Sequence, residues 1–258
     1  MENRDVAVIM PALNEEDNIE NAIQDVLSAF NTLNINGELI VINDGSTDHT
    51  KEIVEEKMKS ESLIRLINHE KPKGIGNAFW TGVDASPAKA VCMLPGDNEN
   101  EAMEILRYYP LLDHVDIVVP FIFNRQVRPF FRNILSLIYR LIINTTFLVN
   151  FNYTNGTVFY RRSLLKELSF RSSGFFYQTD ILVRLVKKGY IFAEVPYRLR
   201  TREKGKSKAI SFPSLYNVMK GYFHLVKDIY YNGSNSKNTI FIMDSQTAIR
   251  SNRPSTNL

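Results

Sequence analysis

The first half of the chain alternates between short apolar runs and longer segments whose apolar residues recur at helical spacing. The apolar runs have the length of buried strands and lie at 5–11, 37–43, 62–68, 89–94 and 115–121. The segments with helical spacing lie between them, at 16–33, 48–58, 74–85 and 101–112. This alternation predicts an α/β fold with a mostly parallel sheet flanked by helices. Ligands of such sheets bind beyond the carboxyl ends of the strands.

The second half of the chain is less regular. Its spacing predicts helices over 129–149, 175–188 and 213–231, and strands over 154–160 and 190–197. From Asn232 onward the chain is polar, apart from a short apolar patch. We interpret the whole chain as one domain over 1–231 with a helical C-terminal extension. A flexible polar tail over 232–258 follows this domain.

The composition is that of a globular protein. Of 258 residues, 44% are hydrophobic and 23% are charged, which excludes a mostly disordered chain. The one cysteine, Cys92, excludes an intramolecular disulfide and a cysteine-cluster metal site, and it suits a reducing compartment. The first residues lack the pattern of a secretory signal, and the longest uncharged run, 141–160, is too polar to span a bilayer. We therefore expect a cytoplasmic protein, either free or peripheral at the cytoplasmic face of a membrane.

The net charge of +3 is unevenly distributed. Residues 196–208 hold six basic residues and one acid, and residues 125–140 hold four arginines and no acid. The rest of the chain is therefore net acidic. Two local basic segments on an acidic body favour a small anionic ligand and argue against a nucleic-acid partner.

Polar or acidic residues follow three of the expected strands: PALNEE at 11–16, NDGSTD at 43–48 and PGDNE at 95–99. Because the carboxyl ends of parallel strands share one edge of a sheet, these three loops should meet there. The alternative is that Asp44 and Asp48 are ordinary turn and cap residues. That alternative does not explain why all three loops are polar.

These loops resemble those of family 2 glycosyltransferases with the GT-A (Rossmann-like) fold. Within that family the chain is most similar to the dolichol/polyprenyl-phosphate sugar synthase branch. The resemblance extends over roughly 5–231 and includes KPKGIGNAFWTG at 71–82, NYTNGTVFYRR at 152–162 and VPYRLRTREKGKSK at 195–208. It implies a nucleotide-sugar-binding half over 1–122 and an acceptor half over 123–231.

The resemblance implies a nucleotide-diphospho-sugar donor, linked to GDP or UDP. The positions that match the family's donor site are Pro11, Leu13, Glu15, Ile42, Asp44, Gly96, Arg125, Arg202 and Lys208. A carboxylate such as Asp44 or Glu15 can accept hydrogen bonds from a base or a ribose. Arginine offers bidentate contacts to phosphate, and lysine offers a point charge.

The resemblance also implies a divalent metal ion. Asp97 lies at the last aspartate of the family's D-x-D motif, whose first aspartate is replaced here by Pro95. Glu99 offers a second carboxylate, so one or two carboxylates and the donor diphosphate would hold Mg²⁺ or Mn²⁺. The alternative is that Glu99 merely begins the next helix.

Three residues are candidates for catalysis: Asp97, Asp180 and Arg202. Arg202 and Lys208 match the family's basic loop, which we interpret as a lid over the diphosphate or, alternatively, as a solvated charged loop. Asp180 matches an acidic position near the acceptor, where it would act as a general base if the acceptor is a sugar hydroxyl. Its alternative is an ion pair with Arg184, four residues along the helix.

The function that the resemblance implies is inverting transfer of a sugar to a polyprenyl phosphate, by a single displacement. An anionic phosphate needs no strong base, which suits the replacement of the family's aspartate by Asn152. Two alternatives remain: transfer to a sugar hydroxyl in cell-surface polysaccharide synthesis, or a non-catalytic scaffold on a degenerate transferase fold. Arg128, Arg132 and the aromatic helix at 213–231 are candidates for contacts with a membrane surface.

Overall fold

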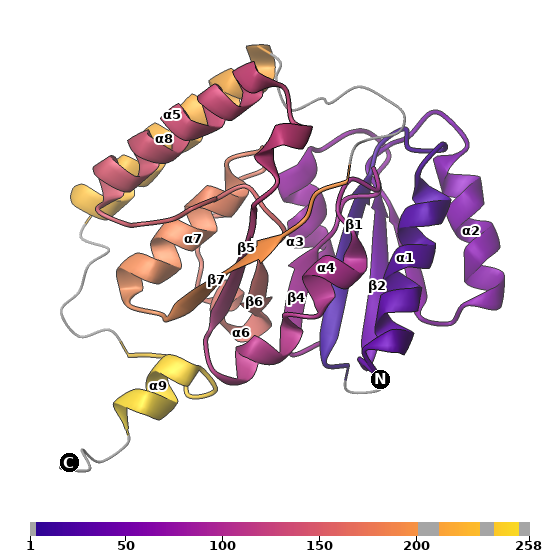
Figure 1. Ribbon diagram of the computed structural model, residues 1–258, viewed down its shortest axis with the longest axis horizontal. Coiled ribbons are helices and arrows are strands. Elements are labelled where there is room, and N and C mark those ends of the chain that lie inside the picture. Colours follow the sequence, from indigo (N-terminus) through magenta and orange to yellow (C-terminus); the bar gives the residue numbers. More distant parts are fainter. Residues whose placement is uncertain (1–3, 201–211, 233–239, 253–258) are drawn as a thin grey trace.

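A computed structural model describes residues 4–200, 212–232 and 240–252. Its centre is a sheet of seven strands in the order β3-β2-β1-β4-β6-β5-β7 (Figure 1). The strands are β1 (Val6–Ala12), β2 (Gly37–Asn43), β3 (Ile64–Asn68), β4 (Ala90–Met93), β5 (Ile117–Ile122), β6 (Phe159–Arg161) and β7 (Phe192–Tyr197). All pairs are parallel except the two made by β6, which runs antiparallel to β4 and β5. The predicted α/β fold is confirmed.

Helices cover both faces of the sheet (Figure 1). The longer ones are α1 (Ile19–Thr32), α2 (Thr50–Ser60), α3 (Ile75–Ala85), α5 (Phe130–Phe147), α7 (Tyr177–Lys188) and α8 (Phe212–Tyr230). The shorter ones are α4 (Ala102–Leu106), α6 (Arg162–Lys166), α9 (Gln246–Ser251) and the 3₁₀ turns η1 (Tyr109–Asp113) and η2 (Arg125–Val127). Most of these elements lie within a few residues of the ranges that the hydrophobic pattern predicts.

Each face of the sheet has its own apolar core, because side chains alternate along a strand. On β1, Val6 and Val8 pack in the core that includes α1 and α4, whereas Ala7 and Ile9 pack in the core that includes α3 and α7. All four β1 residues are fully buried. With both faces covered, the central strands form a rigid base for the loops at their ends.

Two predicted elements differ from the structure. The expected helix over 101–112 is divided into α4 and η1, and Pro110 at the start of η1 lacks the N–H that would continue an α-helix. The expected strand over 154–160 is only the short strand β6, and α6 follows it directly. Short apolar runs cannot be assigned from periodicity alone, which accounts for both differences.

Part of the expected tail is structured. Residues 240–252 contain α9, which lies at the end of the sheet opposite the loops described below (Figure 1). The Asp116 carboxylate, fully buried before β5, accepts hydrogen bonds from the backbone N–H of Gln246 at 2.6 Å and of Thr247 at 3.1 Å. Phe241 packs edge-on against Tyr190. The interpretation of 232–258 as a flexible tail therefore does not describe residues 240–252.

Candidate functional site

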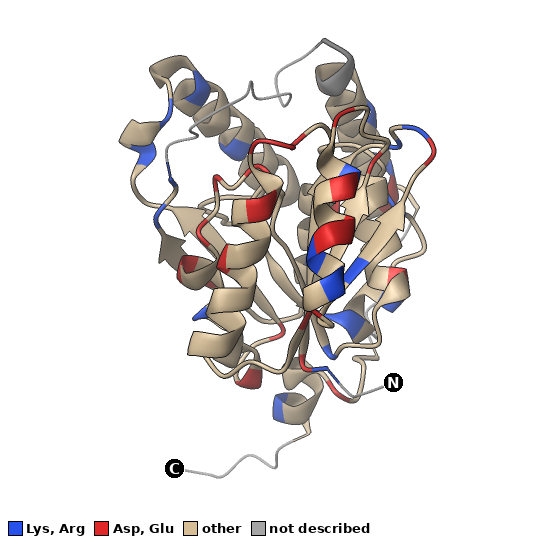
Figure 2. Ribbon diagram, turned by 90° about the vertical axis from the view of Figure 1, so that its right-hand side faces the viewer, with Lys and Arg blue, Asp and Glu red and all other residues tan. Residues whose placement is uncertain are grey.

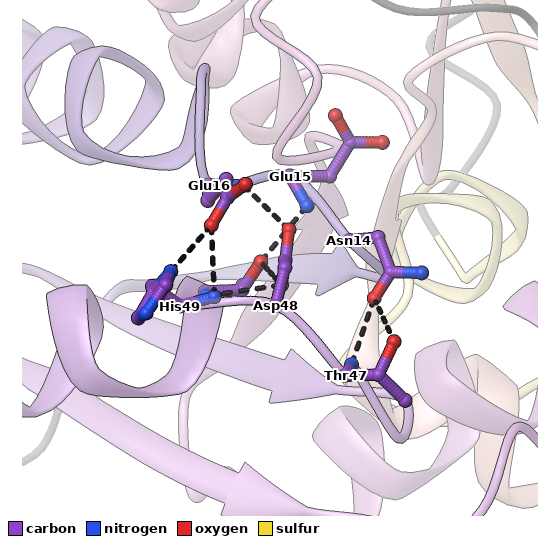
Figure 3. Close-up of polar contacts among 7 residues, drawn as sticks. Asn14, Glu15, Glu16, Thr47, Asp48 and His49 are labelled. Carbon is purple, nitrogen blue, oxygen red and sulfur yellow. Dashed lines mark hydrogen bonds and ion pairs between the residues drawn. The ribbon is translucent and has the colours of Figure 1, made fainter.

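The loops after β1 and β2 are joined by hydrogen bonds at the carboxyl end of the sheet (Figure 3). Asn14 has a positive φ of 54°, and its Oδ1 accepts a hydrogen bond from the Thr47 backbone N–H at 2.8 Å. The backbone N–H of Asn14 donates to Ser46 Oγ at 3.0 Å. Asparagine tolerates the left-handed conformation that this turn requires. The PALNEE and NDGSTD loops therefore lie side by side, as their positions after neighbouring strands predict.

Glu16, Asp48 and His49 form a second link between the same loops (Figure 3). Glu16 Oε2 accepts from the backbone N–H of His49 at 3.0 Å and lies 2.8 Å from its Nδ1. These bonds lower the pKa of Glu16, and the side-chain bond raises the pKa of His49. The cluster is exposed, so it holds two loops together at the surface.

Asp44 is buried, and its carboxylate already has three donors from the protein. His69 Nδ1 lies 2.6 Å from Oδ1, and the backbone N–H groups of Lys73 and Gly74 donate to Oδ1 and Oδ2 at 2.9 Å each. A carboxylate accepts about four hydrogen bonds, so little capacity is left for a nucleoside. This geometry favours a role for Asp44 in holding the loop at 70–76 over direct contact with the donor.

The loop at 70–76 turns its backbone N–H groups inward. Besides the two bonds to Asp44, Gly76 N–H donates to the carbonyl of Ser173 at 2.9 Å. Gly74 has a φ of +94°, and a Cβ at Gly76 would lie 2.4 Å from the Ser172 carbonyl oxygen. Glycine is needed here for close packing against 172–173. The loop therefore does not form a phosphate cradle of the kind found in nucleotide-binding loops.

The remaining expected donor residues differ in accessibility. Pro11, Leu13 and Glu15 are partly exposed along the first loop. Ile42 is fully buried in the core of β2, so its side chain offers no surface to a ligand in this structure. A contact between Ile42 and the nucleoside therefore stays a prediction, and in this structure only its backbone at the end of β2 could supply it.

The Asp97 loop lies beside the first loop. Gly96 N–H donates to the carbonyl of Pro11 at 3.0 Å, and a Cβ at Gly96 would lie 2.7 Å from Ile19 Cδ1. Asp97 is partly exposed and accepts from the Glu99 backbone N–H at 3.2 Å. All three polar loops therefore meet at one edge of the sheet, where Figure 2 shows acidic residues along the upper loops.

The chain leaves β7 next to this loop. Arg200 N–H donates to the carbonyl of Glu99 at 3.0 Å, and Asn100 forms an isolated antiparallel bridge with Leu199. The Arg200 guanidinium forms ion pairs with Asp25 and Glu101. Arg202 and Lys208 lie outside the described residues, so their expected contacts as a lid stay a prediction. The basic segment nevertheless begins beside Glu99.

The acidic residues at this edge of the sheet could supply only some of the ligands of a divalent cation, and the others would come from outside the protein. Within the described ranges, no group of three or more His, Cys, Asp and Glu side chains gathers as a metal site. Asp97 and Glu99 are close in sequence and supply hard oxygen donors. Magnesium is commonly held by one or two carboxylates together with substrate phosphates and water. This donor set therefore fits Mg²⁺ or Mn²⁺ bound with a diphosphate.

A small pocket lies between η2, the first turns of α5 and Tyr153. It is lined by Ile122, Arg125, Arg128, Asn133, Ser136 and Tyr153. Arg128 Nη1 donates to the Tyr153 hydroxyl at 3.1 Å, and its buried Nε has no hydrogen-bond partner among the described residues. Burial opposes the charge of Arg128, but its interactions with neighbouring groups, chiefly Tyr153, outweigh that effect and raise its pKa. The resemblance implied a donor contact for Arg125, and Arg128 was a candidate for contact with a membrane surface, so the pocket that the two share was not predicted.

Asp180 is buried at 1% exposure in the first turn of α7. Its carboxylate accepts from Arg184 Nε at 3.0 and 3.1 Å, and Arg184 also donates to Asp228 of α8 at 2.7 Å. Burial raises the pKa of Asp180, and the Arg184 charge opposes that rise. This is the ion pair that the sequence left open as the alternative. A carboxylate that is buried and paired in this way is poorly placed to take a proton from an acceptor.

The helices α5 and α8 lie side by side (Figure 1), and both expose large apolar side chains. Tyr222 of α8 contacts α5 through a hydrogen bond to Thr146 and an edge-on contact with Phe147. The large apolar side chains that these helices expose include Phe130, Phe131, Leu137, Ile138, Leu141, Ile142, Leu215, Tyr216, Met219 and Phe223. We call these ten residues the apolar face. None of the helices in the described ranges has the length and hydropathy of a membrane span.

Comparisons with known proteins agree with this geometry. Residues 7–169 match the sequence profile of Glycosyl transferase family 2. The uncharacterized protein MJ0544 of Methanocaldococcus jannaschii is 27% identical over 194 residues, which are 70% of this chain and 82% of that protein. An uncharacterized glycosyltransferase of Synechocystis, sll0501, is 30% identical over 93 residues, which are 36% of this chain and 29% of that protein.

The fold is also that of a solved glycosyltransferase. Glucosyl-3-phosphoglycerate synthase from Mycobacterium tuberculosis, in complex with Mn²⁺, UDP and phosphoglyceric acid, superposes with a TM-score of 0.68 at 20% identity. The match covers 86% of this chain and 78% of that one. The same enzyme has a structure with Mg²⁺ and UDP.

The chain belongs to glycosyl transferase family 2, since the matched profile covers more than half of it. It is therefore a glycosyltransferase with the GT-A fold and acts on a nucleotide-sugar. The family match therefore favours an active transferase over the scaffold alternative.

Proposed function

We propose that this enzyme transfers a sugar from a GDP- or UDP-linked donor to a polyprenyl phosphate at the surface of a membrane, with inversion at the anomeric carbon. The observation that carries the proposal is the position of the Arg128 pocket. It lies at the start of α5, where the apolar face begins with Phe130 and Phe131. A polyprenyl phosphate needs a cationic pocket for its head beside an apolar surface for its chain.

The donor would bind at the edge where the three polar loops meet. Pro11, Leu13 and Glu15 are accessible to the nucleoside, and Asp97 and Glu99 would hold Mg²⁺ or Mn²⁺ with the diphosphate. Such an ion would neutralise the leaving nucleotide diphosphate. Metal and UDP in the mycobacterial synthase are consistent with this arrangement. Arg202 and Lys208 remain candidates for contacts to the diphosphate.

The acceptor phosphate would bind to Arg125 and Arg128, whose guanidinium groups suit bidentate contacts with phosphate. An oxygen of the phosphate attacks the anomeric carbon from the face opposite the leaving group. The new carbon–oxygen bond forms as the bond to the diphosphate breaks. The nucleophile is already anionic, so the protein need not supply a general base. The burial of Asp180 in its ion pair with Arg184 suits this chemistry better than attack by a sugar hydroxyl.

The apolar face would rest on the membrane, with Arg132 and Arg140 of α5 near anionic lipid head groups. Each basic residue near such a surface contributes about 1 kcal/mol to binding. This orientation places the acceptor pocket at the lipid surface, so a polyprenyl phosphate reaches it without leaving the bilayer.

The test is transfer of labelled sugar from a panel of UDP- and GDP-sugars, with Mn²⁺, to three acceptors offered separately. These are a polyprenyl phosphate in vesicles, phosphoglyceric acid and an oligosaccharide. The proposal expects label in the lipid fraction, and Arg128→Gln should raise the KM for lipid acceptor at least about tenfold, because a charged contact is lost. Label in the oligosaccharide or phosphoglycerate fraction alone would contradict the polyprenyl acceptor.

A further inference from the structure

His69 is a buried histidine that connects two loops and a helix at the donor edge. Its Nδ1 lies 2.6 Å from Asp44 Oδ1, and its Nε2 lies 3.1 Å from Thr81 Oγ1 on α3. Its backbone N–H donates to the carbonyl of Asn43 at 2.9 Å. The residue is 6% exposed. Both ring nitrogens therefore have polar partners inside the protein, and the ring has one well-defined orientation.

The hydrogen bonds fix the direction of donation. A carboxylate only accepts hydrogen bonds, so His69 Nδ1 must be the donor to Asp44, beside the two backbone N–H groups. The hydroxyl of Thr81 then occupies the other ring nitrogen. Because the Thr81 hydroxyl holds Nε2 in place, Nδ1 of His69 stays directed at the Asp44 carboxylate.

The same network connects the donor loops to the acceptor half. The backbone N–H of Asp44 donates to the Ala12 carbonyl at 2.8 Å, which ties it to the first loop. Its carboxylate holds Lys73 and Gly74, and the loop continues to Gly76, which bonds to Ser173 ahead of α7. Displacement of the carboxylate would release the loop from the donor edge and from 172–173 together.

We propose that His69 is a positioning residue of the donor site. It orients Asp44 so that both carboxylate oxygens hold the loop at 70–76 beside the loop at 11–15. The role in donor binding rests on the proposed nucleotide-sugar site. Because His69 acts through Asp44 and does not touch the reacting atoms, its loss should weaken binding of the donor and leave the chemical step almost unchanged. Such a loss raises the KM for the donor more than it lowers kcat.

Two substitutions separate positioning from packing. In His69→Asn, the amide nitrogen lies near the place of Nδ1 and keeps a donor to Asp44, whereas His69→Leu fills the space without a donor. His114→Leu is the matched control, since His114 is exposed at the opposite end of the sheet. We expect His69→Leu to raise the Kd for UDP or GDP with Mn²⁺ about tenfold, as for one lost buried hydrogen bond to a charged group. His69→Asn should stay close to wild type, and the control should equal it.

Calorimetric titration gives the Kd values, steady-state kinetics give KM and kcat, and hydrogen exchange reports on the amides of Lys73 and Gly74. His69→Leu should speed exchange at both amides, and His69→Asn should not. If His69→Leu has a lower melting temperature but an unchanged Kd and unchanged exchange, His69 only packs and the proposal is wrong. Equal effects of Asn and Leu would contradict it as well. A wild type that binds neither nucleotide would instead refute the proposed function, and the exchange rates would still show whether His69 holds the loop.

Discussion

Asn124 and the backbone of Leu199 exchange two hydrogen bonds between the ends of β5 and β7. Asn124 Nδ2 donates to the Leu199 carbonyl at 2.9 Å, and Leu199 N–H donates to Asn124 Oδ1 at 2.9 Å. Asn124 is buried, and Leu199 also forms the bridge to Asn100. The start of the basic segment is therefore fixed between the Arg125 turn and the Asp97 loop.

We expect Asn124→Leu to lower kcat/KM for the donor at least about tenfold, because both bonds from Asn124 to the start of the basic segment are lost. Two buried hydrogen bonds contribute about 2 kcal/mol to stability, so the free energy of unfolding should fall by a similar amount. Donor kinetics and urea unfolding measure the two effects. Gln126→Leu, at an exposed position two residues along the same turn, is the control. Wild-type kinetics in Asn124→Leu would show that the basic segment does not depend on this anchor.

Substitutions in the Asp97 loop test the metal site. Asp97→Asn removes a carboxylate but keeps the shape of the side chain, so it should abolish the part of nucleotide affinity that depends on Mn²⁺. Glu99→Gln should weaken that part less, because Glu99 supplies only the second oxygen ligand. Titrations of UDP and GDP with and without Mn²⁺ measure the difference, and Glu61→Gln, an exposed residue at the end of α2, is the control. If Asp97→Asn keeps the wild-type gain in nucleotide affinity on addition of Mn²⁺, the ion does not bind at Asp97.

The sequence predicts the sheet and the meeting of its three polar loops, because strand length and alternation depend on local pattern. It could not predict which polar group binds to which. From the sequence, Asp44 fits the role of a nucleoside ligand as well as that of a turn residue. The three groups that donate hydrogen bonds to its carboxylate lie 25 to 30 residues further along the chain. No pattern in the sequence around His69 indicates its role, since that role depends on contacts with residues after β2 and in α3.

Burial is a second property that the sequence alone could not predict. Asp180 and Arg184 stand four residues apart, a spacing that suits a surface ion pair as well as a catalytic acid beside a substrate. Asp228 on α8 also accepts a hydrogen bond from Arg184, and no pattern within α7 indicates that contact. The docking of α9 on Asp116 depends on a similar long-range contact.

The link between Glu16 and His49 predicts a pH dependence. The pKa of His49 should lie above its ordinary value of about 6.5, because the bond to Glu16 favours the charged ring. This bond stabilises the loops fully below the unfolded pKa, while Glu16 is ionised, and is lost as the pH rises through the folded pKa of His49. An NMR titration of the imidazole measures the shift. Glu16→Gln should return the pKa to its ordinary value, and an unshifted wild-type ring would contradict the contact.

The ion pair on α7 gives a test of the acceptor chemistry. Asp180→Asn leaves the buried Arg184 with only Asp228, so we expect the free energy of unfolding to fall by about 3 kcal/mol. If the acceptor is a lipid phosphate, kcat of the folded enzyme should change little, because no base is required. Urea unfolding and kinetics below the melting temperature separate the two quantities. Loss of turnover in folded Asp180→Asn with intact donor binding would instead support a hydroxyl acceptor.

The apolar face should determine membrane binding without affecting nucleotide binding. Phe131 and Leu141 of α5 are both more than 60% exposed. Burial of each side chain in the lipid boundary contributes about 2 kcal/mol, so Phe131→Ser with Leu141→Ser should lower the vesicle partition coefficient at least about tenfold. Sedimentation with vesicles that contain anionic lipid measures this coefficient. Met58→Ser, which removes an exposed methionine from α2, is the control.

Nucleotide binding and lipid transfer by the double variant distinguish a lost membrane contact from a damaged fold. The double variant should keep the wild-type Kd for the donor nucleotide in solution, because the apolar face lies on helices outside the three polar loops. Its transfer to a polyprenyl phosphate in vesicles should fall in parallel with its partition coefficient, whereas transfer to the same lipid dispersed in detergent should be retained. Equal vesicle binding by the wild type and the double variant would show that this face is covered by something other than lipid.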